Sequence, residues 1–186
     1  ADSFVEFCEK NKIVPIGHCL IWHSQVPQWV FREDAGNAPT RDALLSRMKD
    51  HIVTVVGRYK GRIKGWDVVN EALNEDGTLR PTQWSKIIGE GSEDKKYDFI
   101  ESAFRWTHEA DPDAELYYND YNLEVSKPKC DVAVAIDGRG MVFAYTAPDE
   151  TPGAALLRRP RMEVGGDVLH VDRAGRRLQP QPAARH

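Results

Sequence analysis

The chain has 186 residues, a length typical of one domain of ordinary size. With 41% hydrophobic and 29% charged residues, its composition is that of a globular protein rather than a disordered one. The formal net charge of −4 argues against a general nucleic-acid binder, and no apolar run reaches the roughly 18 residues that a membrane span requires.

The first predicted elements are a buried strand and an amphipathic helix. The apolar run over residues 13–22 has the length and composition of a short buried strand. Thr40 then offers an N-cap, and apolar residues recur every three to four positions from Leu44 to Tyr59. Gly61 supplies a stop signal, so we expect a helix between Thr40 and Gly61.

A second strand, a second helix and a third strand follow. Residues 63–69 are rich in β-forming side chains, and the second helix begins after Ser92 and ends before the pair Asp111-Pro112. Residues 114–118 form the third predicted strand. Because helix and strand alternate with short joints, the chain is predicted to be an α/β protein built from βα units around a parallel sheet.

Polar side chains follow each predicted strand. His18 and His23 flank the end of the first strand. Asn70 and Glu71 follow the second strand, and residues 119–122 follow the third. In α/β folds, ligands bind and chemistry occurs at the carboxyl ends of the strands. The three clusters therefore predict a single pocket, with the side chains typical of carbohydrate binding.

The composition changes near residue 150. Residues 151–186 contain seven arginines and three acidic residues, and no aromatic residue follows Tyr145. An Arg/Pro/Ala/Gly-biased stretch has little apolar surface to offset its ordering entropy. We therefore divide the chain into a folded part, 1–145, and an irregular tail, 146–186. The interspersed acids of the tail disfavour a contact with nucleic acid or an anionic surface.

Two further features limit the function classes. Cys8, Cys19 and Cys130 are too few and too scattered for a disulfide framework or a four-ligand zinc site. The first six residues have neither the basic nor the apolar segment of a signal peptide, so we expect none in this chain. Neither a metal nor another cofactor is predicted.

Three ordered motifs resemble those of one enzyme family. Residues 17–29 read GHCLIWHSQVPQW, residues 65–72 read GWDVVNEA and residues 116–122 read LYYNDYN. They are similar to the third-, fourth- and fifth-strand motifs of the glycoside hydrolase family 10 endo-β-1,4-xylanases, as is the NEDG segment at 74–77. The resemblance implies a (β/α)8 TIM barrel that hydrolyses xylan with retention of configuration. It also implies a monomer, without nucleic acid or membrane as a partner, that is extracellular or periplasmic.

The resemblance assigns roles to residues after the second and third strands. Glu71 corresponds to the general acid/base, which protonates the leaving glycosidic oxygen and then activates water. Asn70 corresponds to the asparagine that bonds the sugar 2-hydroxyl, although an asparagine at a strand end often bonds its own backbone. Asn119 and Tyr121 would line the cleft, and Asp120 would hold the loop.

The motif of the first strand supplies further sugar-binding residues. By resemblance, His18, Trp22 and His23 lie at the subsite next to the cleavage point. Trp22 would offer an apolar face to a pyranose ring, His18 would bond its hydroxyls, and Gln25 belongs to the same motif. Taken singly, such residues pack in a core more often than they contact a ligand. Core packing is the interpretation for the other four tryptophans: Trp29, Trp66, Trp84 and Trp106.

The sequence also departs from the family. A retaining glycosidase needs a second carboxyl about 5–5.5 Å from the first, which this family carries in a Thr-Glu-Leu-Asp-like motif on the seventh strand. Residues 161–169 come nearest to that motif, which makes Glu163 the candidate nucleophile. The first two strands are absent, and residues 136–141 resemble the sixth strand, which implies that most of the fifth helix is deleted. An incomplete barrel of about strands 3 to 6 is therefore predicted.

Three other interpretations stay open. A non-catalytic xylan- or oligosaccharide-binding remnant would bind xylan oligomers without turnover, and an inert misfolded product would neither bind them nor unfold cooperatively. A metal-dependent barrel hydrolase would draw its ligands from four residues: His18, His23, Glu71 and Asp120. Side chains alternate along a strand, so the interval of five places the two histidines on opposite faces and argues against that site.

Overall fold

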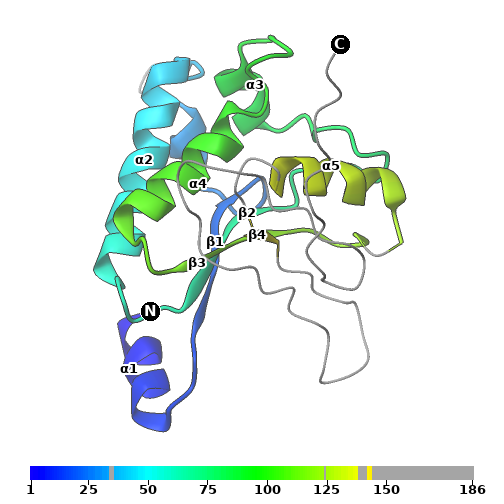
Figure 1. Cartoon of the computed structure of the whole chain (residues 1–186). Helices are drawn as coiled ribbons and strands as arrows, with labels where there is room; N and C mark the ends of the chain where they lie inside the picture. The colour runs from blue at the N-terminus through cyan, green and yellow to red at the C-terminus, as the bar shows by residue number, and fades with distance from the viewer. Residues whose placement is uncertain (34–35, 124, 138–141, 144–186) are drawn as a thin grey trace, which may run out of the picture.

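The computed structural model of the chain describes residues 1–33, 36–123, 125–137 and 142–143. Figure 1 shows the elements along the chain. They are α1 (Asp2–Asn11), β1 (Ile16–Trp22), the 3-10 helix η1 (Gln28–Phe31), α2 (Arg41–Arg58), β2 (Gly65–Asn70), α3 (Gln83–Gly89), α4 (Asp98–Ala110), β3 (Glu115–Asn119), α5 (Lys127–Asp137) and β4 (Val142–Phe143). Helices therefore separate successive strands, as predicted.

The sheet is parallel, and its strands follow the order of the chain. β1 pairs with β2, β2 with β3 and β3 with β4, all in parallel. Figure 1 shows α2, α3 and α4 together on one side of the sheet, and these three helices pack on one another. Sequential parallel strands joined by helices are the repeating unit of a (β/α)8 barrel. The described part of the chain has the architecture of such a barrel segment.

α2 confirms the helix predicted between Thr40 and Gly61. The Thr40 hydroxyl accepts a hydrogen bond from the Ala43 amide over 3.2 Å, which satisfies one of the free donors at the helix start. The buried face consists of residues at intervals of four: Leu44, Met48, Ile52 and Val56. This apolar stripe is the one that the sequence periodicity predicts, and it faces the core.

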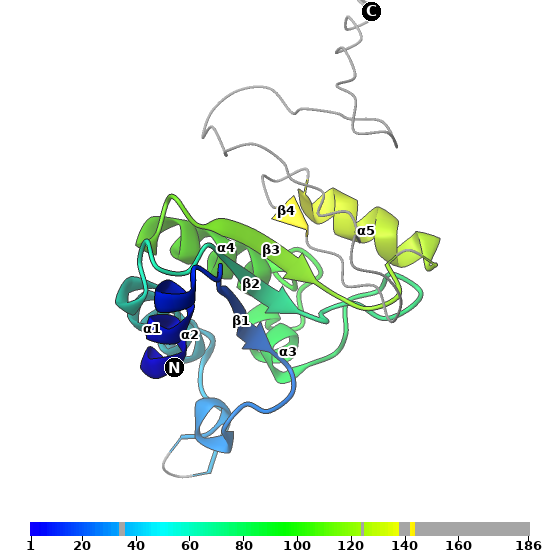
Figure 2. The same cartoon turned by 90° about the horizontal axis from the view of Figure 1, so that it is seen from below.

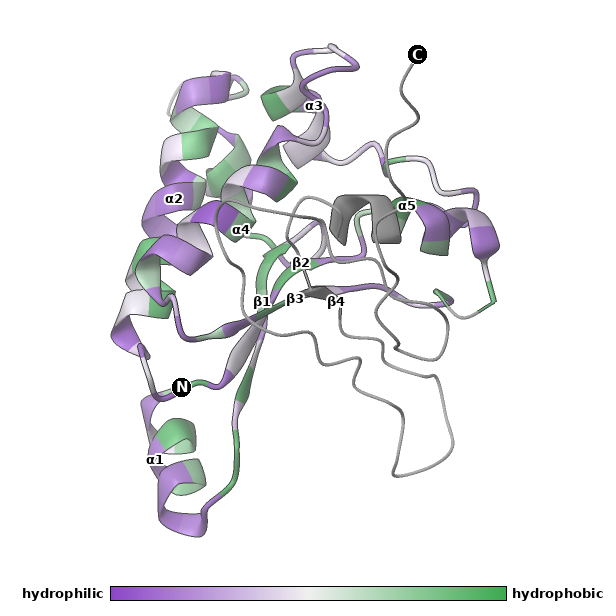
Figure 3. Ribbon diagram, viewed as in Figure 1, coloured by the Kyte–Doolittle hydropathy of each residue, from purple (hydrophilic) through white to green (hydrophobic). Residues whose placement is uncertain are grey.

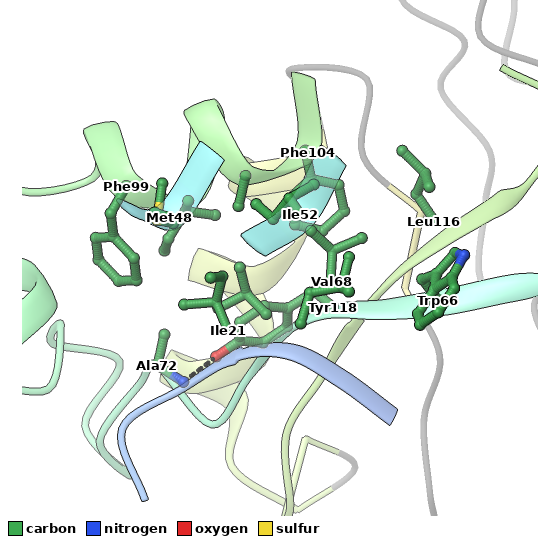
Figure 4. Packing of buried hydrophobic residues seen from close by; sticks show 14 of the residues in the cluster. Ile21, Met48, Ile52, Trp66, Val68, Ala72, Phe99, Phe104, Leu116 and Tyr118 are labelled. Atoms are coloured by element: carbon green, nitrogen blue, oxygen red, sulfur yellow. Dashed lines mark hydrogen bonds between the residues drawn. The ribbon is translucent and has the colours of Figure 1, made fainter. Parts of the chain in front are cut away.

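The core lies between the helices and the strands. Figure 4 shows side chains from α2, α4, β2 and β3 packed together: Met48, Ile52, Phe99, Phe104, Val68 and Tyr118. Figure 3 shows hydrophobic residues along β1 and β2 and both kinds of residue on α2 and α4. Five of the six residues of β2 are buried, the near-continuous burial of a parallel strand beneath helices. The residues that follow β2 therefore start from a rigid base.

Two further helices, α1 and α3, are short. α3 begins with a capping box, in which the side chains of Thr82 and Ser85 each accept a bond from the other residue's amide. α1 is joined to α2 by an ion pair of 2.6 Å between Asp2 and Arg58. Both helices depend on packing against the larger elements, because a helix of 7 or 10 residues is marginal by itself.

The tryptophans follow the predicted core packing with one exception. Trp66, Trp84 and Trp106 are buried, but Trp29 is 66% exposed, so its assignment to the core is wrong. The short helix η1 turns Phe31 inward instead, edge-on against the Trp84 ring at a centroid distance of 4.8 Å. Phe31 occupies the inward position of this turn, which leaves the Trp29 indole outside.

The segment after β3 corrects the prediction for the fifth helix and the sixth strand. Residues 136 and 137 belong to α5, so a strand over 136–141 is wrong at its start, and a helix of 11 residues is present where most of the helix was expected to be deleted. Lys129 and Ala133 are both buried four residues apart, the spacing of one helix face. The following strand β4 pairs with β3 from Val142 onwards. Eleven helical residues thus suffice for this parallel crossover.

Several predictions fall on residues that the structure does not describe. The division at 145/146, the irregular tail and Glu163 lie within residues 144–186 and stay predictions. Among the described residues, none of the helices combines the length and the apolar composition needed to cross a membrane.

Candidate active site

The ends of three strands lie at one level and carry the candidate residues. In the register of the sheet, Trp22 of β1 stands beside Asn70 of β2, which stands beside Asn119 of β3. Figure 2 shows the arrowheads of β1, β2 and β3 pointing the same way. The side chains after these strand ends therefore share one edge of the sheet, as the sequence predicts.

Glu71 is the first residue after β2, and its backbone is held in an unusual conformation. Its φ of 53° lies in the left-handed region, which is uncommon for a residue other than glycine. Its amide donates to the Asn119 carbonyl over 2.8 Å, and its carbonyl accepts from Arg80 Nε over 3.1 Å. Its half-buried carboxylate accepts a bond from Trp22 Nε1 over 3.2 Å. The turn after β2 thus aims this carboxyl towards the end of β1.

Two amide side chains lie next to Glu71. The Asn119 Nδ2 group donates to Asn70 Oδ1 over 2.6 Å. Asn70 is buried, with 3% of its surface exposed, so this bond satisfies an oxygen that has little access to water. The Asn70 side-chain amide is thereby oriented and can use its own Nδ2 as a donor.

The residues of the first motif gather around the Trp22 indole. The ring of His18 lies 6.4 Å and that of His23 5.9 Å from the Trp22 ring, measured between centroids, and both meet it edge-on. Trp84 Nε1 donates to the Trp22 carbonyl over 2.8 Å and fixes the backbone there. The pairing register shifts between His18 and Ile21, so side chains do not alternate strictly along this strand.

The charges around this cluster have identifiable effects. His18 Nδ1 lies 2.8 Å from Asp67 Oδ2. Burial raises the pKa of Asp67 above its usual range, and the hydrogen bond with His18 opposes this effect. The pKa of His23 is lowered, first by partial loss of water and second by the positive charge of Arg80. His23 is therefore neutral near pH 7, and its ring can both donate and accept a hydrogen bond.

Arg80 is a residue of this site that the sequence does not single out. Its guanidinium donates to the carbonyls of Glu71 and Leu73 and, through Nη2, to the Tyr121 hydroxyl over 3.1 Å. Tyr121 itself is 40% exposed and presents an aromatic face at the rim. In the sequence, Arg80 is an arginine that precedes a proline, and no motif marks it as a site residue. Only the fold brings it to these three groups.

A pocket of about 360 Å³ adjoins the Trp22 cluster. Its lining includes six side chains from β1, η1, α2 and the segment between β1 and η1: His18, Trp22, Gln25, Val26, Trp29 and Met48. The structure thus places Gln25 beside His18 and Trp22, whereas the other predicted residues lie at the strand edge around Glu71: Asn70, Asn119 and Tyr121.

The described residues contain no cluster of metal ligands, and the Asp120 carboxylate is not available as a second catalytic carboxyl. In the part of the chain that the structure describes, His, Cys, Asp and Glu side chains form no group of three or more that could hold a metal ion, so the metal interpretation has no ligand set there. Asp120 is 1% exposed and bound by the Tyr118 hydroxyl over 2.5 Å and by Lys129 Nζ over 2.8 Å. Such a carboxylate cannot reach a substrate.

Taken together, the site is an oriented carboxyl surrounded by donors, amides and aromatic faces. A glutamate side chain can give and take a proton, and its partner Trp22 keeps the carboxyl in one orientation. Trp22 and Tyr121 offer faces that suit the apolar side of a sugar ring, while Asn70 and His18 offer hydrogen bonds to hydroxyls. These groups fit the binding and acid–base chemistry of a polyhydroxylated ligand.

Sequence comparison finds relatives over most of the chain. The model of Glycosyl hydrolase family 10 matches residues 1–137. Endo-1,4-beta-xylanase A of Xylanibacter ruminicola is 52% identical over 125 residues, which are 67% of this chain and 32% of that protein. The endo-1,4-beta-xylanase of Geobacillus stearothermophilus is 53% identical over 167 residues, 83% of this chain and 48% of that protein. The chain thus spans less than half the length of either relative.

Solved structures show the same relationship in three dimensions. An endoxylanase retrieved from a sugarcane soil metagenome is 46% identical and superposes with a TM-score of 0.69, over 78% of this chain and 41% of that one. Xylanase 10B of Thermotoga petrophila, solved with xylobiose, is 41% identical with a TM-score of 0.67, over 77% of this chain and 43% of that one.

Proposed function

The chain belongs to glycosyl hydrolase family 10, and we propose that it carries the acid/base part of a retaining endo-1,4-β-xylanase site, with xylan as its substrate. Its fold is an incomplete (β/α)8 barrel, as predicted. One observation carries the proposal: the Glu71 carboxyl follows a central strand and is bonded to Trp22 Nε1 over 3.2 Å. A proton-transferring group is thereby fixed against an aromatic ring that can hold a sugar.

Glu71 would act twice in the reaction. In the first step its carboxyl gives a proton to the glycosidic oxygen as the bond to the sugar breaks. In the second step the carboxylate removes a proton from the water that releases the sugar from the nucleophile. Asn70 would donate its Nδ2 to the sugar 2-hydroxyl, because Asn119 already holds its oxygen over 2.6 Å.

The remaining predicted residues would bind the chain of sugars on either side of Glu71. Trp22 would stack under a ring, with His18 and His23 bonding hydroxyls beside it, since both histidine rings lie within 6.4 Å of the indole. Tyr121 would cover the opposite end of the site. Gln25 has the weakest support, because it lines the adjoining pocket rather than the strand edge.

A second candidate function is binding of xylan oligosaccharides without hydrolysis. It is favoured by the state of Asp120, a carboxylate that is buried and occupied by Tyr118 and Lys129. Retention needs a second carboxyl about 5–5.5 Å from the first. The candidate for it in the sequence, Glu163, lies outside the described residues. Without such a group the site would keep its sugar contacts and lose its nucleophile.

The decisive experiment measures reducing-sugar release from xylan by the 186-residue chain and two variants. Glu71→Gln removes the proton-transferring group and keeps the shape of the side chain. Glu90→Gln is the matched control, because Glu90 is exposed and paired only at the surface with Lys95 over 2.9 Å. We expect release by the native chain and by Glu90→Gln, and a loss of about a hundredfold or more in Glu71→Gln.

The other outcomes separate the two candidates. Equal release by Glu71→Gln and the native chain would overturn the role of Glu71. Absence of release from all three, together with calorimetric binding of xylotriose, would favour the binding function. Absence of both release and binding would contradict both candidates.

Location and assembly complete the proposal. We propose a monomer that acts outside the cell or in the periplasm, where polymeric xylan is available. Among the solved relatives, one from Thermoanaerobacterium saccharolyticum is described as an intracellular xylanase, so location needs its own test. Cell fractionation with an antibody, and light scattering of the purified chain, would decide each point.

A further inference from the structure

Lys129 is a fully buried lysine near the start of α5. Its side chain has 0% exposure, whereas lysine is almost never buried completely unless it is paired. The helix reaches this depth because the preceding Pro128 packs on Gly77, where an added Cβ would lie 2.7 Å from the Pro128 carbonyl oxygen. α5 therefore presses against the loop that follows Glu71.

The Lys129 ammonium has three oxygen partners. Nζ lies 2.8 Å from Asp120 Oδ1, 2.8 Å from the Tyr121 carbonyl oxygen and 3.2 Å from Glu75 Oε1. It also lies 3.7 Å from the centroid of the Tyr121 ring. Glu75 is half exposed, whereas Asp120 is as buried as Lys129. The ammonium thus compensates a carboxylate that water does not reach.

Asp120 in turn holds the backbone that follows Glu71. Its Oδ2 accepts bonds from the Tyr118 hydroxyl over 2.5 Å and from the Leu73 amide over 3.3 Å. The Tyr118 hydroxyl accepts a bond from the Ala72 amide over 3.0 Å, drawn as a dashed line in Figure 4. Ala72 and Leu73 are the two residues directly after Glu71, whose left-handed backbone they must keep in place.

We propose that Lys129 is a positioning residue for Glu71 and acts through Asp120 and Tyr118 on the amides of Ala72 and Leu73. The proposal rests on the role proposed above for Glu71, and it adds the group that keeps its turn in one conformation. Orientation matters greatly here, because a displacement of about 1 Å in a catalytic group can lower a rate by roughly a hundredfold.

The positive charge is the property that this network needs. Without it, the hydrogen-bond donors that the described residues offer to the Asp120 carboxylate would all be neutral: the Tyr118 hydroxyl and the amides of Leu73 and Tyr121. A buried carboxylate without a cation is costly, so it takes up a proton or admits water. A protonated Asp120 would carry a hydroxyl that must itself donate, so its hydrogen bonds with Tyr118, Leu73 and Tyr121 would have to rearrange.

The test replaces Lys129 in the full chain and reads the turn directly. Lys129→Met keeps the length of the side chain and removes the ammonium. Lys127→Met is the matched control, since Lys127 lies on the same helix, is exposed and pairs with Asp131 at the surface. NMR then follows hydrogen exchange of the Ala72 and Leu73 amides, and the indole N–H signal of Trp22, which donates to Glu71.

The expected results differ between the two variants. In Lys129→Met we expect exchange of both amides to accelerate by about tenfold or more, and the Trp22 indole signal to move. Amides in the interior of α2 should keep their rates, and Lys127→Met should leave all of these probes at their native values. Native exchange and a native Trp22 signal in folded Lys129→Met would overturn the proposal.

A second variant covers the case in which Lys129→Met does not fold. Combining Lys129→Met with Asp120→Asn also removes the carboxylate charge that is left behind, so folding no longer requires a bare buried ion. Faster exchange of the Ala72 amide and a moved Trp22 signal are expected again. Native values of both probes in this double variant would equally overturn the proposal.

Kinetics separate positioning from general stabilisation. On xylan, Lys129→Met should lower kcat about tenfold while KM changes by less than about twofold, and Lys127→Met should change neither. A purely structural role would lower the unfolding midpoint and leave kcat per folded molecule unchanged. If the native chain releases no sugar, the proposed function fails, whereas the amide and indole measurements still decide the role of Lys129.

Discussion

Trp22 Nε1 and Glu71 Oε2 are joined by a hydrogen bond of 3.2 Å between residues 49 positions apart. The register explains it, because Trp22 stands beside Asn70 and Glu71 follows Asn70 directly. A bond between an indole N–H and a carboxylate orients both groups together. The aromatic face and the proton-transferring group of the site are therefore fixed relative to each other before any sugar arrives.

Replacing the Trp22 indole should weaken sugar binding. Trp22→Phe removes the donor to Glu71 and shrinks the aromatic face, so we expect affinity for xylotriose to fall about tenfold. Isothermal titration calorimetry measures the effect. Trp106→Phe, in the buried part of α4, is the control and should leave the affinity unchanged. Equal losses in both variants would show that the effect is not specific to the Glu71 contact.

Gly17 should not tolerate a side chain. It stands beside Trp66 in the sheet, and an added Cβ would lie 2.1 Å from the Trp66 ring. We expect Gly17→Ala to lower the free energy of unfolding by about 1–3 kcal/mol, because the buried indole must move. Gly57→Ala is the matched control on α2, where nothing lies within 4 Å of the new Cβ. It should stabilise the fold by about 0.5–1 kcal/mol in urea unfolding.

The pKa of His23 should respond to Arg80. Partial burial and the Arg80 charge lower this pKa below its ordinary value of 6.5, so Arg80→Gln should raise it. As the pH falls, His23 takes up its proton near pH 6.5 in the unfolded chain and only at a lower pH in the folded chain. Folding stability from this group is therefore present above pH 6.5 and decreases as the pH falls below it. Proton NMR titration checks the first effect, and urea unfolding of His23→Gln checks the second.

A control removes a positive charge elsewhere on the surface. Lys86→Gln on α3 should leave the His23 titration unchanged. A His23 midpoint at or above 6.5 in the native chain would contradict the expected direction.

Cys19 should be an unreactive thiol in the folded chain. Burial, and second the charge of Asp67, raise its pKa to about 11 from the ordinary value of 9.0. At pH 8 we expect iodoacetamide to modify Cys19 at least about tenfold more slowly in the folded chain than in urea. Asp67→Asn should accelerate the folded-state reaction and Asp50→Asn should not, as measured by peptide mass spectrometry. Equal rates with and without urea would show that the thiol is not protected.

Features that depend on short stretches of sequence could be predicted without the structure. The interval-of-four stripe of α2 and its Thr40 cap are local, because the helix period and the cap both act within a few residues. The strand ends were accessible for the same reason, since an apolar run followed by polar residues marks the point where a strand leaves the sheet. The positions of Asn70 and Glu71 at the end of the second strand were predicted in this way.

Features that depend on partners distant in the chain could not be predicted from the sequence. In the sequence, nothing distinguishes Lys129 from the lysines near it. Its burial follows from the approach of α5 to Gly77. Arg80 reads as a loop arginine, and its bonds to Glu71 and Tyr121 need the end of β3 beside it. The assignment of Trp29 to the core was wrong for the same reason, because the packing of η1 buries Phe31 instead of Trp29.

The sequence by itself therefore determined the family, the alternation of strands and helices, and the residues that follow each strand. Periodicity, caps and motifs depend on neighbouring positions, so they can be recognised in the sequence without the structure. The tertiary structure alone decided how those residues meet: the Trp22–Glu71 bond, the left-handed turn at Glu71 and the buried Lys129–Asp120 pair. Hydrogen bonds and contact ion pairs form only at distances of a few ångströms, and the strand register and helix packing bring these groups within that range.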